Sequence, residues 1–147
     1  MRILAIQDYL RVGGTESQFL DLTARWAAEG HEVQRLLFRR GGGLFSLSQS
    51  RGPAPVFLQP VATPWNWWSP GLLRAIRKFE PDRIIAFGRN AHWSLGRKIR
   101  GERISGLVAT LRTGRTLPTG YRRILTAAEV VVTNSVFAAG IAKEQGA

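Results

Sequence analysis

Apolar residues along the chain follow two patterns: short runs, and longer segments in which they recur every three or four positions. The short runs predict six strands, at Arg2–Ile6, Val33–Phe38, Val56–Leu58, Arg83–Phe87, Leu107–Leu111 and Val130–Thr133. The longer segments predict helices near 15–29, 70–79, 90–100, 118–128 and 136–145. Strands that are short and apolar, without alternation, are typical of a parallel sheet covered on both faces. We therefore expect one doubly wound, Rossmann-like α/β domain with helices on both faces of the sheet.

Local signals refine the helix ends. Thr15 and Gln18 have the spacing of a capping box, and Gly30 ends the helix that they begin. Ser69-Pro70 predicts another helix start, with a capping hydroxyl before a proline. Three consecutive glycines and several serines between 39 and 50 predict a mobile loop.

Composition removes several kinds of site. The 147 residues include no cysteine, which excludes disulfides, thiolate metal sites and thiol nucleophiles. The two histidines are far apart, so a His-rich metal site is not expected. His31 follows a predicted helix end, and His92 lies beside Trp93, where a packing or capping role is expected. No nucleophile–base pair is evident, and no metal is expected.

The formal net charge of +11 favours anionic partners. The run of 22 uncharged residues from Gly52 to Leu73 is long enough to span a bilayer, but it contains five prolines. Prolines at that density break a helix and leave carbonyl groups without partners, so the segment is not a membrane span. It does carry Trp65, Trp67 and Trp68.

In a doubly wound sheet, ligands bind at the carboxyl ends of the strands, near the point where strand order reverses. Gly13 and Gly14 follow the first predicted strand and precede a helix, so their backbone N–H groups can approach a phosphate or carboxylate. The alternative is that they form only a tight turn. Their spacing matches neither the dinucleotide fingerprint nor the P-loop.

Four short motifs, in order, carry a family resemblance. They are Gly13-Gly14-Thr15-Glu16, Gly30-His31-Glu32-Val33, Pro81-Asp82-Arg83-Ile84-Ile85 and Val131-Val132-Thr133-Asn134-Ser135. Together they resemble the N-terminal domain of retaining glycosyltransferase family 4 enzymes of GT-B architecture, over nearly the whole chain.

The resemblance implies two Rossmann-like domains with the active site between them. The N-terminal domain holds the acceptor, and the C-terminal domain holds the nucleotide-sugar and a pair of glutamates separated by seven residues. This sequence has no such pair. We therefore expect residues 1–147 to be the acceptor-side half of a hexosyltransferase, without the donor domain and inactive alone. No cofactor is implied, because the nucleotide-sugar is a substrate.

The resemblance also implies substrate-binding residues. Gly13 and Gly14 match the family's glycine loop, which approaches the donor diphosphate or the acceptor. Arg112 follows the fifth predicted strand, where many members have a histidine, and its planar guanidinium can pair with a phosphate or a sugar carboxylate. Arg89 is a similar candidate after the fourth strand, and Ser135 is a helix cap that can also face the cleft. For Arg112, a solvated loop arginine is the alternative.

Basic residues gather near 97–103 and 112–123. With Trp65, Trp67 and Trp68, they suggest a surface for a glycan or glycolipid acceptor, or for an anionic membrane. The expected setting is cytoplasmic, on the inner face of the membrane, in cell-envelope polysaccharide synthesis. The tryptophans could instead fill a core or a domain interface. A non-catalytic Rossmann-like binding module is the alternative function, and a nucleic-acid-binding domain is a weaker one because no reading motif is present.

Overall fold

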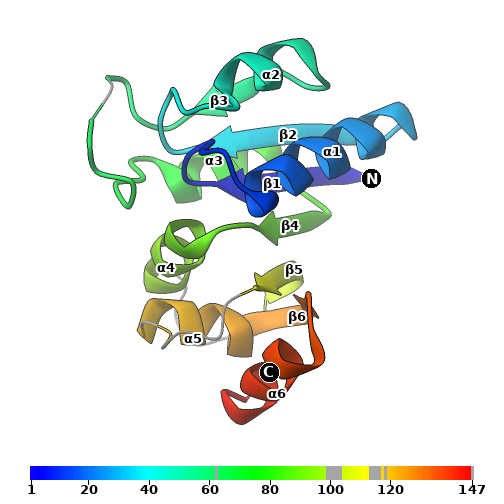
Figure 1. Ribbon diagram of the computed structural model, residues 1–147, viewed down its shortest axis with the longest axis vertical. Coiled ribbons are helices and arrows are strands. Elements are labelled where there is room, and N and C mark those ends of the chain that lie inside the picture. The colour runs from blue at the N-terminus through cyan, green and yellow to red at the C-terminus, as the bar shows by residue number, and fades with distance from the viewer. Residues whose placement is uncertain (62, 99–103, 113–116, 118, 147) are drawn as a thin grey trace.

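A computed structural model describes residues 1–61, 63–98, 104–112, 117 and 119–146. Six strands form one fully parallel sheet in the order β3-β2-β1-β4-β5-β6 (Figure 1). The strands are β1 (Arg2–Gln7), β2 (Glu32–Leu37), β3 (Pro55–Phe57), β4 (Arg83–Ala86), β5 (Ile104–Leu111) and β6 (Ala128–Thr133). This order confirms the doubly wound fold. It reverses between β1 and β4, which is where such sheets bind ligands.

Helices cover the sheet on two sides. They are α1 (Gly14–Ala28), α2 (Phe45–Ser50), α3 (Leu72–Phe79), α4 (Arg89–Lys98), α5 (Thr119–Ala127) and α6 (Val136–Glu144). One hydrophobic cluster contains Ala5 of β1 with Phe19 and Leu20 of α1. The other contains Leu4 and Ile6 of β1 with residues of α3, α4, α5 and α6. Because successive strand residues point to opposite faces, the two clusters are the two faces of the sheet.

Two local predictions were wrong. The segment 39–50 is not loop throughout, because its second half forms α2. The helix expected at Ser69-Pro70 begins later, at Leu72, because Gly71 takes a left-handed conformation with φ of 68° just before it. The expected helix end near Arg100 and the start at Pro118 lie outside the described residues.

A buried arginine explains the helix that the sequence did not predict. Arg35 lies in the middle of β2 and is fully buried. Its guanidinium donates to Thr23 Oγ1 at 2.7 Å, to Ser48 O at 3.2 Å and to Pro53 O at 3.0 Å, and also to Leu20 O and Arg51 O. Burial lowers the pKa of Arg35 to about 10, so it stays charged at neutral pH. The positive charge meets the carbonyl end of α2, where the helix dipole favours it.

Helices α4 and α5 cross at two glycines. A Cβ atom on Gly96 would collide with the carbonyl oxygen of Gly120. A Cβ on Gly120 would lie 2.7 Å from the carbonyl oxygen of Trp93. The backbones of the two helices therefore approach closely, and this contact fixes α4 against α5.

This crossing predicts opposite effects for the same substitution in two helices. Gly96→Ala should destabilise the protein by about 1–3 kcal/mol, because the methyl group overpacks the crossing. Gly140→Ala in α6 should be stabilising by up to about 1 kcal/mol, because alanine is the better helix former and nothing lies within 4 Å of its Cβ. Urea unfolding of both variants measures the difference, and equal effects would contradict the close crossing.

Candidate functional site

Two buried polar side chains lie where β1 ends. Gln7 and Asp8 are both fully buried. One oxygen of Asp8 accepts from Asn90 Nδ2 at 2.7 Å and from Arg11 at 3.0 Å. The other Asp8 oxygen and both polar atoms of the Gln7 side chain have no partner among the described residues. Burial raises the pKa of the Asp8 carboxyl, against the opposing effects of Asn90 and Arg11.

The turn after β4 closes over these groups. Gly88 has a φ of 72°, and a Cβ there would collide with Gln7 Oε1 and lie 2.9 Å from Asp8 Oδ1. Helix α4 begins at Arg89, so Asn90 lies inside its first turn. Its side chain joins the first turn of α4 to Asp8, directly after β1. The switch point therefore holds a polar cluster made from the end of β1, the loop after it and the start of α4.

The glycine loop begins α1 beside this cluster. Gly13, with extended backbone, is the N-cap residue, so the prediction that Thr15 caps the helix was wrong. Gly14 is exposed, and a Cβ there would have open space around it. The Glu16 carboxylate lies 2.7 Å from where a Gly13 Cβ would stand, and it accepts from Arg11 at 3.4 Å. The free N–H groups in the first turn of α1 therefore lie near the Glu16 carboxylate and the Arg11 guanidinium.

His92 joins β4, α4 and β5. Thr110 N donates to His92 Nε2 at 3.0 Å, which leaves Nδ1 to donate to Gly88 O. The imidazole stacks on Tyr121 with ring centroids 4.3 Å apart, and the Tyr121 hydroxyl donates to Thr110 O at 2.7 Å. Burial lowers the pKa of His92 to about 4, so the ring is neutral near pH 7. The expected packing role of His92 is confirmed.

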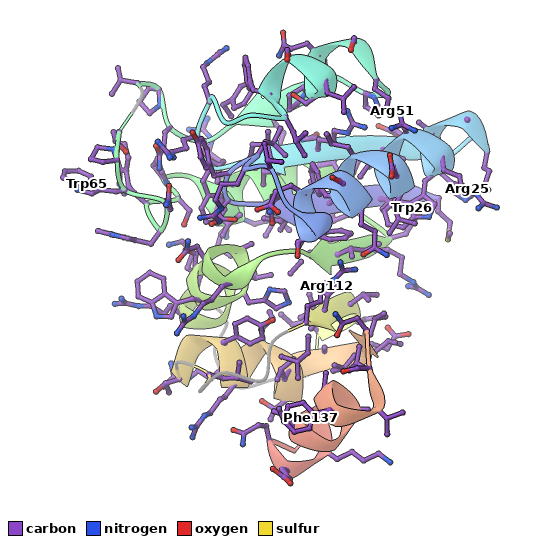
Figure 2. The ribbon with its side chains drawn as sticks, in the orientation of Figure 1. Arg25, Trp26, Arg51, Trp65, Arg112 and Phe137 are labelled. Carbon is purple, nitrogen blue, oxygen red and sulfur yellow. The ribbon has the colours of Figure 1, made fainter. Side chains whose placement is uncertain are left out.

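The two candidate arginines both lie near Tyr121. Arg112 follows β5 and is half-buried, and burial lowers its pKa. Arg89 is exposed at the start of α4. Burial raises the pKa of the Tyr121 hydroxyl, and both guanidinium charges oppose that rise. The fold therefore brings Arg89 and Arg112 to neighbouring positions at the carboxyl edge, with Arg112 near the middle of the molecule in Figure 2.

Ser135 lies after β6, at the same edge by topology. Its side chain accepts from Ala138 N at 3.1 Å, which confirms it as the N-cap of α6. The residue is exposed. The basic residues within 99–103 and 113–116 lie outside the described residues.

Four tryptophans form a group that we call the tryptophan platform: Trp65, Trp67, Trp68 and Trp93. Trp65 stacks on Trp67 at 6.2 Å between ring centroids, and Trp67 meets Trp93 edge-on at 6.1 Å. Trp65 and Trp67 are 53% and 49% exposed, so they do not fill a core. Figure 2 shows Trp65 at the far left and Trp26 on the right-hand side of the molecule.

Hydrogen bonds to the backbone brace the loop that carries the platform. Gln59 is buried, and its Nε2 donates to Trp65 O at 2.8 Å and Trp68 O at 2.7 Å. Thr63 Oγ1 donates to Gln59 Oε1 at 2.9 Å, and Ser94 Oγ of α4 donates to Trp67 O at 2.8 Å. The loop is therefore fixed to α4.

Comparison with protein families shows which family the chain belongs to. The model described as Glycosyltransferase Family 4 matches residues 12–146. The chain belongs to glycosyltransferase family 4. Comparisons with curated proteins and with solved structures gave no significant match.

None of the described helices of this family 4 domain is both long and apolar enough to cross a membrane. Within the described residues, no group of three or more histidine, aspartate or glutamate side chains could hold a metal ion.

Sequence reasoning missed the side chains that position this site. Gln7 and Asp8 are polar residues directly after an apolar strand, and that placement was a usable signal. Gln59 and Asn90 gave no such signal, because their partners lie elsewhere in the chain.

The buried His92 makes the stability of this family 4 domain dependent on pH. As pH falls from about 6.5 to about 4, the unfolded chain binds a proton that the folded ring does not. Above about pH 6.5, His92 makes its full contribution to the free energy of unfolding. That contribution should fall by about 3 kcal/mol as the pH drops to about 4. Asp8 acts in the opposite direction, because its pKa is raised.

The test compares the wild type with His92→Gln, which keeps a donor and an acceptor and leaves Asp8 in place. Urea unfolding from pH 7 to pH 4 should show the advantage of the wild type shrinking as pH falls. Parallel stability profiles for the two proteins would show that His92 is not held neutral by the fold.

Proposed function

We propose that this chain is the acceptor-side half of a GT-B hexosyltransferase, which transfers sugar from a nucleotide-sugar to a glycan or glycolipid acceptor. Family membership supports general glycosyl transfer. A lipid-linked or polysaccharide-precursor acceptor suits a cytoplasmic enzyme of cell-envelope synthesis that works at the inner face of the membrane. The observation that carries the proposal is the open start of α1 at the switch point between β1 and β4.

At that point the chain offers several groups to an anion. The N–H groups of the first turn of α1 lie beside exposed Gly14, and Arg11 adds a nearby positive charge. Arg112 and Arg89 flank the next strands along the edge and can pair with phosphate or sugar carboxylate. Ser135 is a weaker candidate, because its hydroxyl already caps α6. In this proposal Arg112 takes the place of the histidine that many members have.

Large apolar side chains are unusually exposed at the same edge. Val12 after β1 is 80% exposed, and Val136 and Phe137 after β6 are 91% and 71% exposed. Exposed apolar residues that gather at one edge are typical of an interface. They support a partner domain that closes over this edge, and the donor domain of the GT-B architecture is that partner.

A negative charge introduced at position 14 tests whether an anion binds at the start of α1. Gly14→Asp should leave the fold intact or slightly more stable, because the side chain has open space and an acidic residue suits a helix start. It should weaken binding of inorganic pyrophosphate about tenfold, because the added carboxylate repels the anion. Amide chemical shifts of residues 13–16 in an NMR titration give the affinity.

Gly14→Ala is the control, and it should bind as the wild type does. Glu16→Gln is the converse variant. It should bind pyrophosphate more tightly, because it removes a negative charge beside the start of α1. Unchanged affinity in Gly14→Asp would move the anion site away from α1.

Residues 1–147 alone should transfer no sugar. The expected reason is that the donor and the glutamate pair belong to the C-terminal domain in this architecture. Purified protein, incubated with radiolabelled nucleotide-sugars and glycolipid acceptors, should give no labelled product, and a two-domain family 4 enzyme is the positive control. Transfer by the purified chain would overturn the assignment as an acceptor-side half.

A further inference from the structure

The tryptophan platform borders two hollows that lie beside α4. The larger is about 360 Å³, and its lining includes Trp67, Trp68, Trp93, Ser94, Arg97 and Lys98. The smaller is about 220 Å³ and is lined by Trp67, Arg89, Asn90 and Trp93. Trp67 and Trp93 are shared, so one continuous aromatic surface runs from the switch point along α4.

The hollows combine aromatic faces with positive charge. Arg97 lies one helical turn after Trp93, and its guanidinium is 4.7 Å from the centroid of that ring. Lys98 adds a second cation to the larger hollow, and Arg89 adds one to the smaller. Among the described residues that line them, none is acidic. Their charge therefore complements an anion.

Exposed tryptophans held in place indicate a ligand that stacks. Leaving large apolar rings in water opposes the hydrophobic effect, yet Gln59 and Ser94 fix the backbone of this loop. Such bracing lowers the entropy cost of binding, because the platform is already ordered. The C–H groups of a pyranose ring present an apolar face that suits the electron-rich face of an indole.

We propose that the platform is a subsite for an anionic saccharide, in which Trp67 and Trp93 hold a sugar ring while Arg97 and Lys98 hold its carboxylate or phosphate. This rests on the proposed acceptor-side function and specifies the acceptor as a charged glycan. The larger hollow is of ligand size, since binding pockets are typically about 300–1,000 Å³. A concave surface suits a sugar ring better than a flat bilayer, which is met by protruding side chains.

The subsite also continues into the switch-point cluster. Asn90 lines the smaller hollow and donates to Asp8 at 2.7 Å. A glycan lying over Trp67 would therefore extend from the larger hollow toward the end of β1. This places the platform on the acceptor's path and not at a separate surface.

The test is an NMR titration that follows the indole N–H signals with three probes: methyl glucuronide, glucose 6-phosphate and methyl glucoside. The signals of Trp67 and Trp93 should shift, while the signal of Trp26, which packs against the other face of the sheet, should not. One or both charged probes should bind at least about fivefold more tightly than the neutral one. The comparison of glucuronide with sugar phosphate shows which anion the subsite prefers.

Variants separate stacking from charge. Trp67→Ala should abolish the shifts and keep the fold, because Ser94 bonds the Trp67 backbone and not its ring. The double variant Arg97→Gln, Lys98→Gln should bind the charged probes only as tightly as it binds methyl glucoside. Phe137→Ala and Lys143→Gln, which alter an exposed ring and a cation outside the hollows, should change nothing.

Several results would overturn the proposal. They are no shift at Trp67 and Trp93 with any probe, equal affinity for charged and neutral probes, or vesicle binding in place of saccharide binding. The last would be seen as Trp67-dependent sedimentation with phosphatidylglycerol vesicles and no saccharide shift. Failure here is distinguishable from failure of the proposed function, because the pyrophosphate response of residues 13–16 is read in a separate titration.

Discussion

The backbone of Thr110 is the constraint on which the carboxyl edge depends. Its N–H donates to His92 and its C=O accepts from Tyr121, so two side chains satisfy both groups at the end of β5. Moving a peptide group from water into an apolar interior without a hydrogen-bond partner costs about 2–7 kcal/mol. Burial keeps His92 neutral, so its Nε2 can accept from Thr110. The two bonds tie α4 and α5 to the end of β5, where Arg89 and Arg112 lie.

The same edge carries polar groups that are only partly satisfied. The Asp8 carboxylate is bonded through one oxygen, and the Gln7 side-chain amide has no partner among the described residues. Unpaired buried polar atoms are uncommon in folded proteins, and each one calls for an explanation such as a ligand or a bound water. They lie beside the start of α1, where the anion site is proposed, and the smaller hollow of the platform reaches them through Asn90.

Predictions from the sequence succeeded where the signal was local. The six strands were found within a few residues of their observed bounds, since apolar runs and helical spacing reflect burial directly. Gly13-Gly14 was correctly placed at a helix start, although Thr15 was wrongly assigned as its cap. Helix α2 was missed because it is six residues long and is held by Arg35, whose bonds no local pattern reveals.

By itself, the sequence determined the fold class, because right-handed crossovers between parallel strands leave little choice of topology. The fold class in turn predicts the edge at which ligands are expected. Only the tertiary structure decided which side chains meet there. Asn90 reaches Asp8 across 82 positions, and Ser94 reaches Trp67 across 27. Such bonds depend on how the elements pack, so they become visible only when the sheet and its helices are assembled.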